Sequence, residues 1–174
     1  MNLTGINGEM ADVDKEGRLQ VRAVAIPEAK QQILDGDGFV WDFTGYDYDA
    51  ADTVMFIRND HPDKNLVIDA IELYGDTASK IQVHCPANPT VAGTEITGTN
   101  WNRAKGGLPL ATAYQDETGN TQANIIKTTY TAANAVTDLL RENECIVLGY
   151  HQCLGVDLVT AGTMAYGQIV GHYE

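Results

Sequence analysis

The sequence predicts an all-β protein, an antiparallel two-sheet sandwich of the jelly-roll type with an extended N-terminal arm. About nine or ten short segments rich in Val, Ile and aromatic residues recur at intervals of roughly 10 to 15 residues, separated by Gly, Pro, Asp and Asn. The regular alternation of strands and helices that builds a parallel sheet is missing. We therefore expect antiparallel strands packed in two layers.

The clearest strands lie between residues 53 and 89. Three apolar segments are joined there by short links containing Pro, Gly, Asp or Ser, which predicts successive antiparallel strands connected by hairpin loops. The segments are 53–59, 65–74 and 80–85. In the last of these, Ile81 and Val83 alternate with Gln82 and His84, as in a strand with one buried face and one wet face.

The residues before this region predict a strand that ends at a proline, then a short helix and another strand. Residues 18–26 alternate apolar and polar side chains, and Pro27 ends the strand because a central strand cannot lose a backbone N–H. Residues 28–34 favour one or two helical turns. Gly and Asp at 35–38 predict a turn, and the aromatic residues at 39–44 predict a strand.

The residues after this region predict a long loop and further strands. We expect strands at 94–97, 110–114, 122–129, 144–150, 154–160 and 163–173, a loop at 100–110 and a helical turn at 131–140. The two-residue link Ala161-Gly162 predicts a hairpin between the last two strands.

A chain of 174 residues fits one domain preceded by an arm. We expect residues 1–17 to form the extended arm and residues 18–174 the β-sandwich domain. Apolar side chains in the arm follow no helical or strand period, and Gly5, Gly8 and Gly17 interrupt them. Such a segment becomes ordered when it lies on a neighbour, and otherwise it is a frayed terminus.

The net charge of −13 sets the expected partners. An acidic chain repels phosphate groups, so neither direct nucleic-acid binding nor an anionic membrane surface is expected. The N-terminus lacks the basic and apolar blocks of a signal peptide, and no apolar run reaches the length of a membrane span. The expectation is a protein made in the cytoplasm.

The residues that carry chemistry form no recognisable catalytic motif. Cys85, Cys145 and Cys153 are predicted to be buried free thiols, because they form no CxxC pair. A metal site of His151 and Cys153 is imaginable, since residues i and i+2 of a strand share a face. The acidic stretches 35–38 and 47–49 do not match a calcium-binding loop and are interpreted as solvated turns. We expect no enzyme, cofactor or metal.

Several short segments together carry a family resemblance. They are Gly17–Val21 (GRLQV), 53–59 (TVMFIRN), 65–71 (NLVIDAI), 88–94 (NPTVAGT), Asn102-Arg103 and 155–173 (GVDLVTAGTMAYGQIVGHY). With them, most of residues 17–174 resembles a loosely related group of virion proteins of tailed bacteriophages and prophages. The resemblance consists of the pattern of apolar residues in the strands and of these short sequence segments, and it includes no catalytic motif.

The resemblance implies a structural protein of the virus particle, most like a capsid decoration (cement) protein. Such proteins are commonly β-rich trimers on the capsid exterior that bridge neighbouring capsid subunits. The implied partners are further copies of the chain, as a homotrimer, and the major capsid protein. An arm that reaches a neighbour and an acidic surface that avoids DNA both suit that role, and a neck or tail component fits the same segments.

Two functions from different classes remain after this comparison. The first is an assembly protein, with contacts expected from Leu3, Ile6 and Met10 in the arm and from Trp101, Arg103 and Lys105 in the 100–110 loop. The second is a host-recognition or carbohydrate-binding module of the virion. In that case exposed aromatic side chains would stack on sugar rings, and the candidates are Tyr46, Tyr48, Trp101 and Tyr114.

Overall fold

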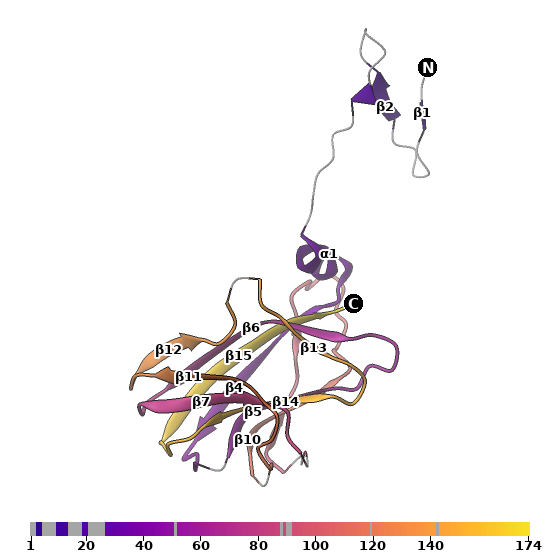
Figure 1. Cartoon of the computed structure of the whole chain (residues 1–174). Helices are drawn as coiled ribbons and strands as arrows, with labels where there is room; N and C mark the ends of the chain where they lie inside the picture. The colour runs from indigo at the N-terminus through magenta and orange to yellow at the C-terminus, as the bar shows by residue number, and fades with distance from the viewer. Residues whose placement is uncertain are drawn as a thin grey trace.

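Two antiparallel sheets stacked face to face make up most of the described chain (Figure 1). The computed structural model describes residues 3–4, 10–13, 19–20, 27–50, 52–87, 89, 92–118, 120–141 and 143–174. Of the first three of these ranges only the backbone is described. The predicted antiparallel sandwich is confirmed.

The two sheets are named here after their central strands. The β14 sheet holds, in spatial order, β11 (Ile125–Thr131), β7 (Ser79–His84), β14 (Cys153–Leu158), β5 (Thr53–Asn59), β10 (Ala111–Glu117) and β8 (Thr94–Ile96). The β15 sheet holds β12 (Ala135–Asp138), β6 (Leu66–Gly75), β15 (Met164–Tyr173), β4 (Gly38–Tyr46) and β9 (Thr99–Asn100), and β13 (Ile146–Leu148) also pairs with β6.

The strand order is that of a jelly roll. The first four strands of the sandwich pair with its last four main strands in reverse order. These pairs are β4 with β15, β5 with β14, β6 with β12, and β7 with β11. These strand pairs then wrap around the core, so that β6 also pairs with β15 and β7 also pairs with β14. Strands β8, β9 and β10 are an insertion that extends one edge of each sheet. This double wrapping is the jelly-roll topology that the sequence predicts.

The prediction of hairpins between residues 53 and 85 is wrong. Strands β5 and β7 belong to the β14 sheet, whereas β6, between them in sequence, belongs to the β15 sheet. The short links therefore carry the chain from one sheet to the other. The last two strands behave in the same way, because β14 and β15 lie in different sheets and Ala161-Gly162 is not a hairpin turn.

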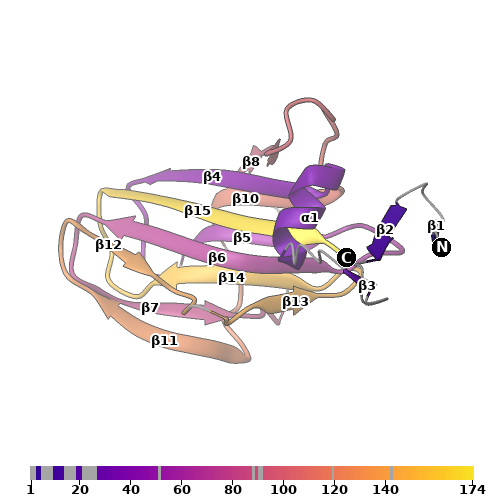
Figure 2. The same cartoon turned by 90° about the horizontal axis from the view of Figure 1, so that it is seen from above.

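The main core lies between the two sheets, which Figure 1 shows edge-on and Figure 2 from above. Apolar side chains from both sheets are completely or almost completely buried there, including Trp41, Ile57, Ile71, Ile81 and Leu154. Burying one such side chain contributes about 2 kcal/mol to the hydrophobic stabilisation. The alternation that the sequence shows at Ile81 correctly identifies the face of β7 that points into this core.

The opposite face of β7 is also buried, contrary to the prediction of a wet face. Gln82 and His84 lie under the two connections that run between the opposite edges of the β14 sheet, at residues 85–93 and 117–124. These connections are joined by a backbone hydrogen bond from the Ala87 N–H to the Thr121 carbonyl, 3.0 Å. Every residue of β14 is buried as a result.

One helix closes one end of the sandwich. Helix α1 (Glu28–Asp35) lies against the ends of β4 and β15 and ends at Gly36, whose φ of 91° is the left-handed cap that glycine favours. This agrees with the predicted short helix and turn. Among the described residues, no helix is long and apolar enough to cross a membrane.

The remaining differences from the sequence-based expectations are local. Residues 131–140 form the end of β11 and all of β12 instead of a helical turn. In the N-terminal region β1 (Leu3–Thr4), β2 (Met10–Val13) and β3 (Leu19–Gln20) pair as a small antiparallel sheet. The rest of the predicted strand at 18–26 lies outside the described residues.

Candidate interaction surfaces

The predicted contact loop at residues 100–110, called here the end loop, is fastened to helix α1 by two asparagines. The buried Asn100 donates from Nδ2 to the Gly36 carbonyl at 2.6 Å and accepts the Asn102 N–H at 2.8 Å. Asn102 donates from Nδ2 to the Leu34 carbonyl at 2.7 Å. Both asparagines bind the carbonyls that the helix end leaves without a partner, so the loop is held to the rigid scaffold.

The end loop presents apolar and basic side chains to solvent. Trp101 is 49 % exposed and Leu108 72 % exposed, and Leu34 of helix α1 is also exposed. Arg103 and Lys105 are exposed, and within the described part of the chain neither forms an ion pair. Residues 98–114 contain no Asp or Glu, so the loop itself is basic on a protein of net charge −13, whereas Asp35 and Asp37 flank Gly36 at the helix end that it contacts.

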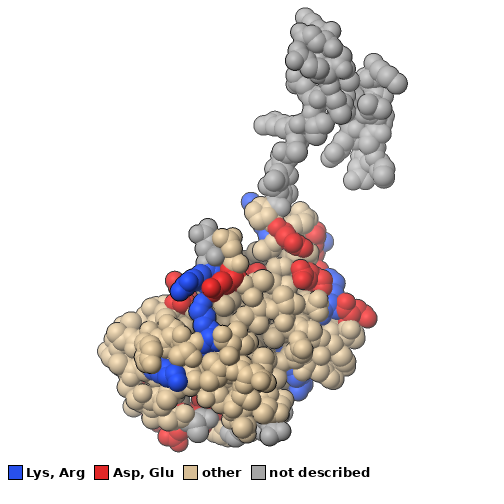
Figure 3. Space-filling view, viewed as in Figure 1, with Lys and Arg blue, Asp and Glu red and all other residues tan. Residues whose placement is uncertain are grey.

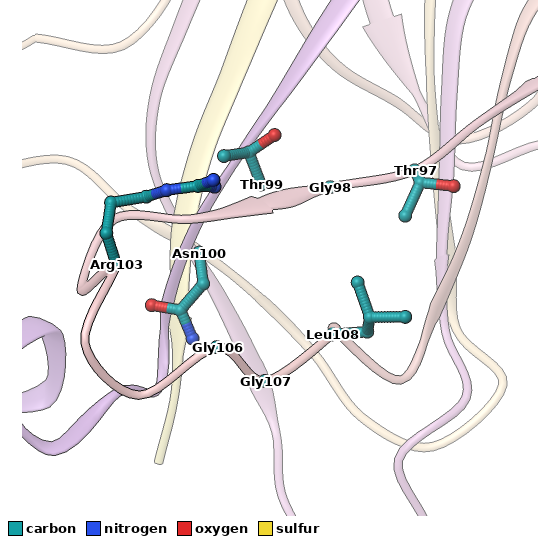
Figure 4. Close-up of a pocket in the computed structure, with 8 residues that line it drawn as sticks. All are labelled: Thr97, Gly98, Thr99, Asn100, Arg103, Gly106, Gly107 and Leu108. Atoms are coloured by element: carbon teal, nitrogen blue, oxygen red, sulfur yellow. The ribbon is translucent and has the colours of Figure 1, made fainter.

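A hollow of about 360 Å³ lies inside the end loop (Figure 4). It is lined by Thr97, Gly98, Thr99, Asn100, Arg103, Gly106, Gly107 and Leu108. Figure 4 shows the Arg103 side chain extending back along β9 with its guanidinium toward Thr99, and Leu108 at the opposite wall. The hollow thus offers hydroxyl, amide and guanidinium groups on one side and an apolar wall on the other.

The other aromatic candidates do not join Trp101. Tyr48 was predicted to be exposed, but it is only 1 % exposed and its hydroxyl lies 3.5 Å from Asp76 Oδ1. Its burial and the nearby Asp76 carboxylate raise the pKa of Tyr48. Tyr114 is half-buried in β10, and the side chain of Tyr46 is outside the described part. Trp101 is therefore the one exposed aromatic residue of that set whose side chain the structure describes.

A second surface, called here the side cleft, opens between the β11 edge of one sheet and β13 of the other. Ile126 and Ile146 stand on its two walls, and the cleft continues as two hollows of about 370 and 410 Å³. The Lys127 ammonium and the Glu144 carboxylate approach to 2.5 Å across it. Figure 3 shows this face as mainly uncharged atoms with a few basic and acidic groups. Sequence periodicity gave no indication of the cleft, because it depends on how far apart the sheet edges lie.

The three cysteines all line the side cleft. Cys153 is buried as predicted and Cys85 is half-buried, and burial raises the pKa of both thiols. Cys145 is exposed, so its predicted burial is wrong. It lies in the connection before β13, where the chain runs over the mouth of the cleft and no sheet covers it.

The side chains of the predicted arm contacts lie outside the part of the chain whose side chains the structure describes. Leu3 lies in β1 and Met10 in β2, of which the structure describes only the backbone. Ile6 lies outside the described residues. The contact role of all three stays a prediction.

The imagined metal site of His151 and Cys153 does not form. His151 precedes β14 and has a left-handed φ of 61°, so the two side chains are not neighbours on one strand face. His151 is exposed and its Nε2 lies 3.9 Å from Asp60 Oδ1, whereas Cys153 is buried. Among the residues that the structure describes, no group of three His, Cys, Asp or Glu side chains could hold a metal ion.

A cluster of aspartates occupies the end of the sandwich remote from helix α1, between β4 and β5 and at the end of β10. Burial raises the pKa of Asp116, and the nearby carboxylates of Asp52, Asp47 and Asp49 raise it further. Asp52 accepts the Asp49 N–H at 2.8 Å, so this stretch is a structured turn. The expected solvated turn is correct for the exposed Asp47 and Asp49, whereas Asp52 is buried.

Comparison with protein-family models, with curated proteins and with solved structures finds no match to this chain. The two surfaces are therefore interpreted from their geometry and chemistry.

Proposed function

We propose that this protein is a non-enzymatic structural protein of a phage virion, which decorates and stabilises the capsid exterior through contacts with its own copies and with the major capsid protein. The observation that carries the proposal is the end loop, which is held to helix α1 and presents exposed apolar side chains and two basic side chains that form no ion pair with any described residue, on an acidic protein.

The way the end loop is held supports a binding role. Its two asparagines make three hydrogen bonds to helix α1 and to each other, of 2.6 to 2.8 Å. A loop that is already ordered loses little conformational entropy when it docks, so more of the contact energy contributes to affinity. Tryptophan and arginine, both present here, are the residues that most often dominate the energy of protein interfaces.

Charge and sequence likeness supply the class of partner. Arg103 and Lys105 favour an acidic docking surface, and the acidic remainder of the chain is unsuited to the DNA-filled interior of a capsid. The resemblance of residues 17–174 to tailed-phage virion proteins names the capsid as that surface. A homotrimer on the capsid exterior is the assembly that the same resemblance favours.

The described histidine–carboxylate pairs favour a structural role over catalysis. His84 and Asp157 are buried beneath the crossing connections, where a substrate has no access. His172 Nδ1 lies 2.7 Å from Asp69 Oδ2, and the histidine itself is buried in β15. In these two pairs the carboxylate gives one buried imidazole nitrogen a partner, whereas His84 Nδ1 has none among the described residues. The third described pair, His151 and Asp60, is 3.9 Å apart with the histidine exposed.

The test is the stability of empty capsids assembled from the major capsid protein of the phage or prophage that carries this gene. Calorimetry of the shells with and without the protein should show a higher melting temperature when it is bound. The Trp101→Ala variant should give a smaller shift than Val136→Ala, which removes an exposed apolar side chain from β12 instead. Shells that melt at the same temperature with and without the protein would contradict the proposal.

A host-recognition function is the second candidate, and one observation favours it. Trp101 lies at the start of the end loop, whose hollow is lined by the polar side chains of Thr97, Thr99 and Asn100. Trp101 does not itself line the hollow, but an exposed aromatic residue next in sequence to a polar hollow is a combination that suits a sugar. Binding to a glycan array that is lost in Trp101→Ala, together with no binding to capsids, would favour this candidate.

A further inference from the structure

Strand β11 is the longest of the outermost strands, although β4 also has an open stretch beyond the two residues that pair with β9. The strands at the other edges, β8, β9, β12 and β13, have two to four residues, whereas β11 has seven. Among the described residues β11 pairs with β7 on one side alone. Proteins usually shorten, charge or cover an edge strand because its unpaired backbone groups attract another strand. Lys127 is the one charged residue of β11.

Several large side chains of β11 are exposed to solvent, as expected of a strand whose outer edge pairs with another strand. Tyr130 is 74 % exposed and Ile126 48 % exposed, and Ile125 and Thr128 are exposed as well. Ile126 also forms one wall of the side cleft. An added strand would bury these side chains and pair the open backbone groups of β11.

The same chain contains a segment with the pattern of the missing strand. Residues 18–26 (RLQVRAVAI) alternate polar and apolar side chains as far as Arg22 and are apolar from there to Pro27. Of them only Leu19 and Gln20 are placed, in β3, where one side of the strand pairs with β2. The segment carries Arg18 and Arg22 and no acidic residue, whereas the rest of the chain holds all of the acids. The net negative charge of the rest of the chain attracts a basic segment in general, but β11 itself carries only the positive charge of Lys127, so charge does not select this edge.

The segment cannot reach β11 of its own copy. Only Pro27 separates residue 26 from the first residue of helix α1, so the end of the segment is held at the helix. The helix lies against β4 and β15 of one sheet, whereas β11 is the far edge of the other sheet. Figure 2 shows β6, β14 and β7 between them. Adjacent strands are about 4.8 Å apart and stacked sheets about 10 Å, a distance that one residue cannot cross.

We propose that residues 18–26 of one copy add as a strand to the β11 edge of a second copy. The contact is heterologous, because it joins two different parts of the chain, and three copies arranged about an axis would close it into a ring. This inference rests on the self-association in the proposed function, and it specifies the segments that make the contact.

The test is the solution mass of the full chain and four variants by light scattering on a sizing column. Val21→Pro removes a backbone N–H from the added strand, and Thr128→Lys places a charge on the open edge. The matched controls are Asn7→Pro, outside the segment, and Thr160→Lys, at an exposed position outside any strand. The wild type and both controls should form a closed oligomer, and the first two variants should run at the monomer mass of 18.9 kDa.

Hydrogen exchange separates loss of the contact from loss of folding. The β11 amides that face away from β7 should be protected in the wild type and exchange rapidly in Val21→Pro, while the β11 amides that face β7 and the β14 amides should stay protected in both. A monomeric wild type at high concentration, or a Val21→Pro variant that still forms the oligomer, would overturn the inference. An oligomer that does not bind capsids would instead leave the inference standing and contradict the proposed function.

Discussion

His84 and Asp157 form a buried pair on the face of the β14 sheet that points away from the main core, with 2.9 Å between His84 Nε2 and Asp157 Oδ1. Gln122, from the connection that crosses above them, donates from Nε2 to Asp157 Oδ2 at 2.9 Å and to Gln82 Oε1 at 3.0 Å. A Cβ on Gly155 would lie 2.7 Å from His84 Nε2, so glycine is required beside the imidazole. The pair fastens the crossover to the sheet.

We predict that Asp157→Ala destabilises the protein by about 3 kcal/mol, because it leaves the buried His84 Nε2 without its partner and removes one of the two acceptors of Gln122. For a chain of this size the melting temperature should fall by roughly 6 to 12 °C. The matched control is Asp69→Ala, which removes the acceptor of His172 at a half-exposed position and should cost about 1 kcal/mol. Equal losses in the two variants would show that the crossover is not held by this pair.

The aspartate cluster predicts a substitution that stabilises the protein. Asp116→Asn removes one of the carboxylates that repel each other there, and asparagine tolerates the positive φ of 55° at this position. Because Asp116 is partly exposed, the gain at pH 7 should be below about 1 kcal/mol, or about 2 °C in melting temperature. Glu95→Gln, which removes an exposed carboxylate from β8, is the control and should have no effect.

The pH dependence of this gain follows from the direction of the pKa shift. The pKa of Asp116 is raised in the folded state, so the folded protein binds the proton more tightly than the unfolded chain. The wild type therefore loses stability as the pH rises from the ordinary value of 3.8 through the raised pKa. The Asp116→Asn gain should be complete at pH 7 and absent at pH 3. A gain that persists at pH 3 would assign it to the backbone instead.

The end loop predicts that stability and binding can be separated. Asn100→Ala removes the donor to the Gly36 carbonyl and the acceptor of the Asn102 N–H, and should destabilise the protein by about 2 kcal/mol. Trp101→Ala should leave the melting temperature unchanged and weaken binding to capsids by about tenfold or more. If Trp101→Ala binds as tightly as the wild type, the end loop is not the docking surface.

The positions of most strands could be predicted, because the alternation of apolar and polar residues identifies a strand locally. Which strands pair with one another could not be predicted. The link between β5 and β6 is of a length that suits a hairpin and equally suits a step between sheets, so composition could not separate the two. The wet face predicted for Gln82 and His84 is wrong for a related reason. A crossover more than 30 residues further along the chain covers that face, and periodicity within one strand cannot report it.

For the candidate surfaces too, features set by the local sequence were predicted and features set by the three-dimensional packing were not. Trp101 and the basic residues of the end loop were found because a long loop rich in Gly on a β-scaffold is exposed by default. Tyr48 was misplaced, because a polar sequence around it hides the contact of its ring with Gly162 and its hydroxyl with Asp76. The side cleft was missed, since the distance between two sheet edges leaves no pattern in sequence.

Co-sedimentation with empty capsids tests the central claim most directly. The protein should bind shells of the major capsid protein of the phage or prophage that carries its gene, and it should saturate at a fixed number of copies per shell. Binding should weaken as salt rises, because Arg103 and Lys105 contribute. A protein that stays in the supernatant at every salt and protein concentration would contradict the claim that it decorates a capsid.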